Sequence, residues 1–314
     1  MTPHIAAHPA GTATAEALEA AAQLLEGSSQ YRVLRRLVPR DQFGLRPSGN
    51  VLRAAIVDTE TTGTDPATDR IIELCVLVFE YCEASGQVLA VRQVYDGLED
   101  PGRPIPPQST AIHGITDEMV AGQQLDEQAV TALLQGVSWV IAHNAGFDRP
   151  LLERRLPLFA GLRWLCSMKE VPWEQMGFPG TKLEYLATAR GFFYDGHRSE
   201  VDCRAVLELL RLPLAGDGGL PMLRLLAAGQ RVSYRIYALG SPFETKDMMK
   251  ARGYRWDGER RSWWVEVDHD EAAAEAQWLR EQVYGGRSRK VEVEILDAGT
   301  RYLARRGKVV YKDL

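Results

Sequence analysis

Apolar positions run almost without interruption through three early segments of the chain, at 51–57, 71–81 and 86–98. Runs of this length, bounded by turn-forming residues, are typical of buried β-strands. The tetrapeptide EASG that separates the last two predicts a turn between them. Before these strands, residues 16–37 have the apolar spacing of a helix with an interruption at 27–29, so two short helices are expected.

After residue 100 the pattern alternates between the periods of helices and strands. Thr116 stands at an expected helix start, with two acidic residues behind it, while Gly191 closes one helix and Ser199 opens another. Three adjacent strands followed by alternating helices and strands predict an α/β domain with a mixed central sheet flanked by helices. The expected helices are 116–134, 148–157, 182–191 and 199–210, and the expected strands are 138–143 and 162–168.

A stretch rich in Gly and Pro at 213–221 divides the chain into two parts. Beyond it, the order strand, helix, hairpin, helix and a last alternating hairpin predicts a small α+β domain. Residues 1–15 are small and polar, so we expect them to be disordered. The predicted divisions are an N-terminal tail with short helices at 1–50, the α/β domain at 51–212, a linker at 213–230 and the small domain at 231–314.

The composition is ordinary for a globular protein, since 45% of the 314 residues are hydrophobic and 25% are charged. No apolar run approaches the ~20 residues that span a bilayer, so no membrane partner is expected. The N-terminus lacks the regions of a secretory signal, and the four cysteines form no CxxC pair. We therefore expect a cytoplasmic protein with buried, reduced thiols.

The net charge of −5 is distributed unevenly along the chain. Residues 230–314 hold 17 Lys and Arg against 14 Asp and Glu, whereas residues 1–229 hold 20 against 28. An acidic front and a mildly basic tail are compatible with a cation site followed by a region that contacts phosphates. The overall negative charge therefore does not exclude nucleic acid as a partner.

Asp58 and Glu60 stand where the first strand ends, in the stretch IVDTETTG. Side chains two residues apart in a strand point to the same face, so these carboxylates repel each other unless a proton or a cation intervenes. Hard oxygen ligands of this kind suit Mg²⁺ or Mn²⁺. The alternative is a solvated turn cap, because D-x-E is a common tripeptide.

Two later stretches carry related chemistry. In HNAGFD an apolar strand leads to Asn144 and then to Asp148 in a helix, and simple capping by Asn144 is the alternative. In HRSEVD, His197 and Asp202 lie about 140° apart on a helical wheel and cannot share a helical face. His197 is therefore expected on the loop before the helix, with Ser199 as N-cap and Asp202 in the first turn. A solvated loop histidine is the alternative.

The order of these acidic residues resembles that of the DnaQ-like 3′–5′ exonucleases of the DEDDh branch. In both, an acidic pair follows the first strand, a third Asp follows a later strand, and a His–Asp pair stands at a helix start. This family is related to the epsilon proofreading subunit of bacterial DNA polymerase III. PQSTAIHGITDEMV and KLEYLA are similar to two further segments of the family. The resemblance covers about 52–212 and implies a ribonuclease H-like fold. CSM at 166–168 and HRSEVD depart from common family patterns without changing the five matching residues, Asp58, Glu60, Asp148, His197 and Asp202.

The resemblance implies phosphodiester hydrolysis with two divalent cations, Mg²⁺ or Mn²⁺. Asp58 would bridge both ions, and Glu60 and Asp202 would complete the site beside the attacking water. Asp148 would act on the other ion, and His197 would take the proton from the water. The implied substrate-binding residues are Thr59, Thr61, Ile112, His113, Asn144 and Phe147. For Ile112 and Phe147, a place in the hydrophobic core is the alternative.

The stretch 241–267 resembles short basic and aromatic modules that are appended to DNA- and RNA-processing proteins. Lys and Arg can hold phosphates there, while aromatic rings can stack on bases. The alternative is that the tryptophans form a small core; both hold if Trp256 and Trp263 lie inside and the charges outside. The residues concerned are Lys246, Lys250, Arg252, Tyr254, Arg255, Trp256, Arg260, Arg261, Trp263 and Trp264.

The leading hypothesis is a metal-dependent 3′–5′ exonuclease that shortens single-stranded DNA or frayed 3′ ends in proofreading or repair. A DNA polymerase or a repair protein is a candidate partner, and the oligomeric state is open. One alternative keeps the chemistry but trims RNA. Another is a catalytically idle nucleic-acid-binding protein, against which the intact set of five residues argues.

Overall fold

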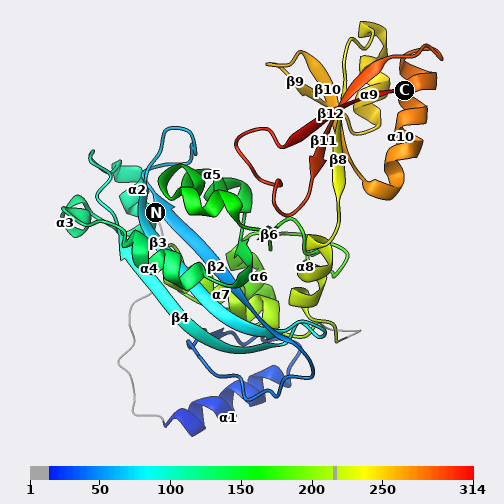
Figure 1. Ribbon diagram of the computed structural model, residues 1–314. Helices are drawn as coiled ribbons and strands as arrows, with labels where there is room; N and C mark the ends of the chain where they lie inside the picture. Colours follow the sequence, from blue (N-terminus) through cyan, green and yellow to red (C-terminus); the bar gives the residue numbers. More distant parts are fainter. Residues whose placement is uncertain (1–13, 215–217) are drawn as a thin grey trace.

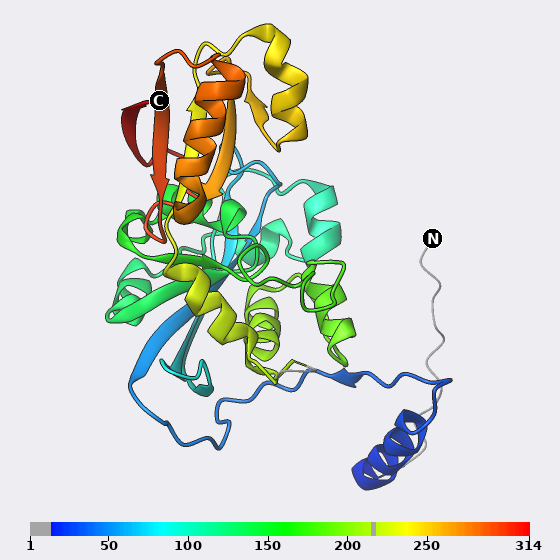
Figure 2. The same ribbon diagram turned by 90° about the vertical axis from the view of Figure 1, so that its right-hand side faces the viewer.

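The computed structural model describes residues 14–214 and 218–314. They fold into a larger α/β part and a smaller α+β part that contains the C-terminus (Figure 1). The smaller part lies above the larger part in both ribbon views (Figures 1 and 2). The disorder expected for 1–15 falls almost entirely outside the described residues.

A five-stranded mixed sheet forms the centre of the larger part, in the order β4-β3-β2-β5-β6. The strands are β2 (Val51–Thr61), β3 (Ile71–Cys82), β4 (Val88–Leu98), β5 (Val137–Ala142) and β6 (Trp164–Cys166). β2 and β4 are antiparallel to β3, whereas β5 runs parallel to both β2 and β6. Nearly all of β3 is buried, which explains why its sequence is apolar without alternation. The mixed sheet and the separate sheet of the C-terminal part confirm the predicted ribonuclease H-like fold class with an added α+β domain.

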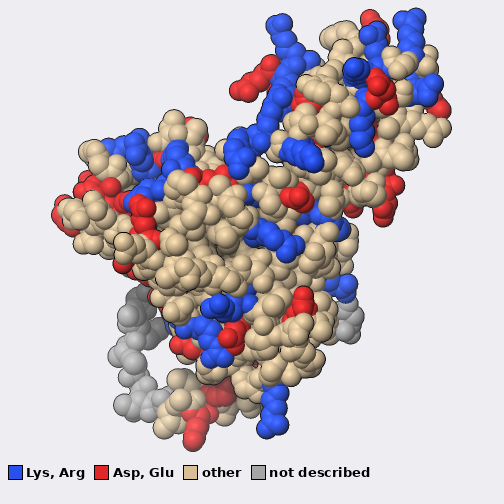
Figure 3. Space-filling view, in the orientation of Figure 1, with Lys and Arg blue, Asp and Glu red and all other residues tan. Residues whose placement is uncertain are grey.

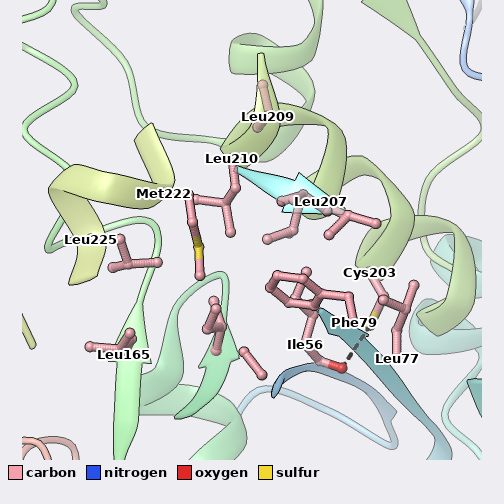
Figure 4. Close-up of a cluster of buried hydrophobic side chains, with 14 of the residues drawn as sticks. Ile56, Leu77, Phe79, Leu165, Cys203, Leu207, Leu209, Leu210, Met222 and Leu225 are labelled. Atoms are coloured by element: carbon pink, nitrogen blue, oxygen red, sulfur yellow. Dashed lines mark hydrogen bonds between the residues drawn. The ribbon is translucent and has the colours of Figure 1, made fainter. Parts of the chain in front are cut away.

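Helices cover both faces of this sheet (Figure 1). They are α2 (Pro107–His113), α3 (Asp117–Val120), α4 (Glu127–Leu134), α5 (Ala145–Arg155), η1 (Pro157–Gly161), α6 (Leu183–Ala189), α7 (Ser199–Arg211) and α8 (Pro221–Gly229). On one face, Ile56 and Phe79 pack against α7 and α8 (Figure 4). The opposite face packs against α4 and α5. The single helix predicted at 116–134 is wrong, because Gly122, with a φ of +71°, separates α3 from α4.

The N-terminal segment forms one helix rather than the two that its apolar spacing predicted. α1 (Ala15–Glu26) is followed by β1 (Arg35–Arg36), which pairs in parallel with β7 (Phe192–Phe193). Arg35 joins the two elements, since its guanidinium binds Glu19 at 2.8 Å and Glu26 at 2.5 Å. A strand pairing with a distant segment therefore replaces the second predicted helix.

The segment 213–230, which composition predicted as a linker, contains α8. Met222 and Leu225 of this helix are fully buried, and Figure 4 shows them beside Leu165 and Leu210. The Gly-rich part of the segment is confined to its beginning, where residues 215–217 lie outside the described ranges. α8 thus contributes to the core of the larger part.

The smaller part is a five-stranded antiparallel sheet in the order β12-β11-β8-β10-β9. Its elements are β8 (Ser233–Ala238), η2 (Phe243–Thr245), α9 (Lys246–Ala251), β9 (Arg255–Asp257), β10 (Ser262–Asp268), η3 (His269–Glu271), α10 (Ala272–Trp278), η4 (Leu279–Val283), β11 (Lys290–Leu296) and β12 (Lys308–Asp313). Met249 of α9 and Leu279 after α10 pack on one face of the sheet, and the partly buried Trp263 packs against this core, in agreement with the alternative that the tryptophans form a small core. Trp256 does not: it is 52% exposed, because β9 is an edge strand.

All four cysteines are buried, as their apolar surroundings predicted. Among the residues that the structure describes, no helix is both long and apolar enough to cross a bilayer.

Candidate metal centre

Three carboxylates meet at the end of β2. Asp58 and Glu60 lie two residues apart in the strand, and Asp202 approaches them from α7. One ligand oxygen from each residue lies within 4.8 Å of the other two. Because Asp202 is far from the first two in sequence, a solvated turn cap does not account for this convergence. The fold brings together three of the four metal ligands that the resemblance implied.

Asp202 is held in place by the backbone at the start of its own helix. Its Oδ2 accepts hydrogen bonds from the backbone N–H of His197 at 2.7 Å and of Arg198 at 3.2 Å. The predicted cap, Ser199, is wrong by one residue, because α7 begins at Ser199 and Arg198 is its N-cap. The carboxylate of Asp202 takes over the capping role from within the first turn, which fixes its position beside β2.

Glu73 supports the same corner and was missed by sequence reasoning. It lies buried in β3, where its carboxylate accepts hydrogen bonds from the Arg198 guanidinium at 2.6 Å and from the Ser199 backbone N–H at 2.9 Å. These bonds attach the N-terminus of α7, and with it His197 and Asp202, to the central sheet. An acidic residue inside the apolar run IIELCVLVF was the available signal, since buried carboxylates need partners.

Asp148 lies close to the cluster but outside the group of three. It is buried in the first turn of α5, and its Oδ1 accepts a 2.9 Å hydrogen bond from the hydroxyl of Thr59. Thr59, which the resemblance placed beside a nucleotide, is buried, and its hydroxyl orients Asp148. The alternation of β2 explains this, because Thr59 faces the side of the sheet opposite to its neighbours.

The carboxylates disfavour one another's ionisation. Burial and the neighbouring charges of Asp148, Asp202 and Glu60 raise the pKa of Asp58 well above its usual range. Burial, with Asp202 as the next cause, raises the pKa of Glu60 to about 8, and burial raises that of Asp148 to about 7. Burial also raises the pKa of Asp202. Such a cluster favours either bound protons or a compensating cation.

The donor set fits hard divalent cations. Asp58, Glu60 and Asp202 each offer a carboxylate oxygen to one point, and Asp148 offers another nearby. Carboxylate oxygens are the ligands that Mg²⁺ and Mn²⁺ prefer, and a divalent charge offsets the repulsion that raises these pKa values. The residues present therefore match the cations that the resemblance implied.

His197 stands at the rim of the cluster, on the loop before α7 as predicted. Its backbone has a φ of +67°, a left-handed conformation that is uncommon for a residue with a side chain. About half of its side chain is exposed, and its Nε2 lies 3.8 Å from the Oε1 of Glu184 on α6. The imidazole is therefore accessible from solvent and has an acidic neighbour that the sequence analysis did not identify.

The structure separates the remaining predicted substrate residues by burial. Ile112 is 60% exposed on α2, so it is not a core residue, whereas the partly buried Phe147 packs against the core beneath α5. His113 is buried, and its Nδ1 accepts a hydrogen bond from the Ile115 N–H at 3.0 Å. Burial lowers its pKa, which favours the neutral form of the ring.

Two further predicted contacts lie at chain turns. The hydroxyl of Thr61 donates to the carbonyl of Gly63 at 2.6 Å, which stabilises the turn after β2. Asn144 precedes α5 with a φ of +92°, and its side chain makes no capping hydrogen bond. Simple capping through the Asn144 side chain, the alternative considered from sequence, therefore does not occur.

Comparison with known proteins places this site in a family context. The family model described as RNase_T exonuclease matches residues 55–210, which include the residues discussed above. Exodeoxyribonuclease 10 of Escherichia coli (strain K12) is 32% identical over 162 residues, which cover 49% of this chain and 66% of that protein. The chain thus spans slightly less than two thirds of that relative's length.

Two further similarities are found, one to a protein sequence and one to a solved structure. The uncharacterized exonuclease CP81 of Escherichia phage 186 is 30% identical over 174 residues, which cover 49% of this chain and 84% of that protein. A solved structure of exonuclease X in complex with 5′ overhanging duplex DNA is 26% identical, covering 67% of this chain and 97% of that one, with a TM-score of 0.33.

Proposed function

Because the chain belongs to the RNase_T family of exonucleases, the DnaQ-like group that its motifs indicated, we propose that it is a metal-dependent 3′–5′ exodeoxyribonuclease. The observation that carries the proposal is the convergence of Asp58, Glu60 and Asp202, with Asp148 beside them. This set would hold the two divalent cations, which, when bound, supply charge neutralisation at the phosphate and acidify the attacking water.

The residues of the site would have separate roles in hydrolysis. Asp58, at the centre of the group, would contact both cations, Glu60 and Asp202 would hold the one beside the water, and Asp148 the other. His197 would accept the proton of the water at its imidazole nitrogen. Its solvent exposure allows the proton to leave, and the bonds from Glu73 to the start of α7 hold the loop that carries it.

Single-stranded ends are the proposed substrate, because α2, which is bonded to the turn after β2, carries an exposed apolar side chain. The hydroxyl of Ser109 donates to the carbonyl of Thr62 at 2.9 Å, which holds α2 against the end of β2. Ile112, one turn further along α2, presents its side chain to solvent. An apolar wedge contacts an unstacked terminal base better than a paired one. Action on DNA is supported by the name of the related exodeoxyribonuclease 10.

The biological setting follows from this activity as part of the same proposal. Removal of 3′ nucleotides would serve proofreading or repair in the cytoplasm, together with a DNA polymerase or a repair protein. Trimming of RNA is the competing assignment, because cations held by carboxylates would act on the phosphate, which DNA and RNA share.

The decisive experiment follows degradation of 5′-labelled oligonucleotides on a gel. Single-stranded DNA, duplex DNA, a duplex with a mismatched end and RNA are each tested with Mg²⁺, Mn²⁺ or EDTA. We expect a ladder that shortens from the 3′ end, fastest on single-stranded DNA, and no cleavage in EDTA. Asp58→Asn should abolish it, while the control Asp195→Asn, at a side chain that is 84% exposed, should not.

Three results would overturn the proposal. They are shortening from the 5′ end, cleavage that persists in EDTA, and undiminished cleavage by Asp58→Asn. Faster degradation of RNA than of DNA would instead assign the enzyme to RNA trimming.

A further inference from the structure

A groove separates α5 from the sheet of the C-terminal domain. Its volume is roughly 1090 Å³. One wall is the outer side of α5, with Gly146, Pro150 and Arg154 spaced four residues apart, and the other includes Arg235 and Trp264 of the sheet face opposite α9 and α10. We call this space the interdomain groove. It lies on the other side of α5 from Asp148, so it is distinct from the metal centre.

The walls of the interdomain groove are fastened to each other. The loop at 297–302, between β11 and β12, lies against the larger part, and buried Arg149 of α5 donates to the carbonyls of Gly299 at 2.7 Å and Arg301 at 2.5 Å. In return, Arg301 pairs with Glu170 at 2.8 Å. Because these partners are buried, the groove is a built feature of the fold and not a gap between loosely linked domains.

The groove carries an excess of positive charge. Nine Lys and Arg side chains line it, against five Asp and Glu. Four of the nine form no ion pair with any carboxylate in the described part of the chain: Arg154, Lys169, Arg255 and Arg305. The Arg154 guanidinium donates hydrogen bonds to carbonyl oxygens of the loop after β2. In Figure 3, Lys and Arg gather along the side of the small domain that faces α5. Unpaired cations in a groove attract a polyanion.

Aromatic rings accompany these cations in the lining of the groove. The guanidinium groups of Arg235 and Arg255 lie 4.8 Å and 5.6 Å from the ring centre of Trp264. Tyr302, near the N-terminus of α5, lies 5.6 Å from the Lys169 ammonium. Rings interleaved with cations suit single-stranded nucleic acid, whose unpaired bases can stack while its phosphates are neutralised. A duplex keeps its bases stacked inside and gains nothing from the rings.

We propose that the interdomain groove is a second nucleic-acid-binding site, which holds a single strand several nucleotides away from the end being cleaved. Gly146 at the near end of the groove and Asp148 share the first turn of α5, so a strand can pass over this turn from one site to the other. The 11 residues of α5 extend the contact by about 16 Å. The identification of the held strand as the substrate rests on the proposed exonuclease function. The binding of single strands in the groove does not depend on that function.

The test measures binding in EDTA, where cleavage is prevented. Fluorescence anisotropy follows a labelled thymidine oligonucleotide of about 20 nucleotides, longer than the ~4–16 of a typical single-strand site. Arg255→Glu with Arg305→Glu reverses two groove charges. Arg280→Glu with Arg287→Glu is the matched control, because both side chains are exposed and neither lines the groove. We expect a loss of at least about tenfold for the groove variant, about twofold or less for the control, and a shallower salt dependence for the groove variant.

The remaining outcomes of the binding experiment either overturn the proposal or limit it. Equal affinity of the groove variant and the unchanged protein would overturn the proposal, and an equal loss of binding to a blunt duplex would overturn its assignment to single strands. RNA of the same length is a further arm that separates ribo- from deoxyribo-strands. If the double variant fails to fold by circular dichroism, Arg255→Ala and Arg305→Ala are measured singly.

A second readout separates this proposal from the exonuclease function. In Mg²⁺, cleavage of a dinucleotide, which reaches only the metal centre, should be unchanged in the groove variant, whereas cleavage of the long oligonucleotide at low concentration should fall with its affinity. Absence of any cleavage by the unchanged protein would refute the proposed function, yet the binding measured in EDTA would still decide the groove.

Discussion

Replacement of Thr59 by Val tests how the carboxylate cluster is built. The two side chains have almost the same shape, so Thr59→Val removes only the hydroxyl that donates to Asp148 at 2.9 Å. Both partners are buried, with Thr59 6% and Asp148 3% exposed, so water cannot replace the lost donor. We expect a less stable protein in which the position of Asp148 is less strictly defined.

The size of the effect should depend on pH. Loss of a donor to a buried acceptor costs about 1–3 kcal/mol, with the upper values for an ionised acceptor. Burial raises the pKa of Asp148 to about 7, and the bond from Thr59 opposes that rise. A raised folded-state pKa contributes stability at low pH that is lost as the pH rises through about 7. Because Thr59→Val raises the pKa further, we expect a loss of ~1 kcal/mol at pH 6 and ~2–3 kcal/mol at pH 8.

The assay is guanidinium unfolding in EDTA at the two pH values, followed by tryptophan fluorescence. Thr59→Ser keeps the hydroxyl and should retain most of the stability. The matched control is Thr131→Val, because the exposed Thr131 bonds only to a carbonyl of its own helix, that of Glu127. The reasoning is refuted if Val and Ser at position 59 cost the same, or if the cost of Val is larger at pH 6 than at pH 8.

Three further predictions concern the cluster, its support and the core. In EDTA the melting temperature should fall as the pH rises from about 5 to 8, because the raised carboxyl pKa values favour the protonated folded state. Mg²⁺ should suppress this fall. Parallel curves of melting temperature against pH with and without Mg²⁺ would argue against a cation site. Glu73→Gln should weaken the bond to the half-exposed Arg198 and lower the free energy of unfolding by ~1–2 kcal/mol in a chemical unfolding assay. It should also lower the turnover number more than it changes KM. A loss of stability without a loss of turnover would contradict the positioning role of Glu73. Gly229→Ala would place a Cβ 2.5 Å from Leu165 and should lower the free energy of unfolding by ~1–3 kcal/mol in the same assay. Gly161→Ala, whose Cβ would meet nothing within 4 Å, should cost much less. Equal costs would contradict the packing of α8 in the core.

Several features of the site could be predicted because they depend on local geometry. Asp58 and Glu60 share a side of β2 since strand side chains alternate, and His197 precedes a helix that carries Asp202 in its first turn. The same alternation places Thr59 on the opposite side, where its hydroxyl donates to Asp148. Short-range rules were therefore sufficient wherever the interacting residues lie within one element.

Contacts between distant segments could not be read from the sequence. The pairs Glu73 with Arg198 and Thr59 with Asp148 join residues 125 and 89 positions apart. The apolar period of a segment shows which side is buried but not which partner covers it, and for that reason the pairing of β1 with β7 was missed.

The sequence by itself determined the fold class, the order of the acidic residues and the family, because these depend on periodicity and on motifs that are contiguous in the chain. Only the tertiary structure decided that α8 belongs to the core, that Glu73 and Thr59 position the ligands, and that the loop at 297–302 closes a basic groove against α5. The physical reason is that burial and charge pairing are properties of surfaces brought together by folding, and such surfaces are assembled from segments that are remote in the sequence.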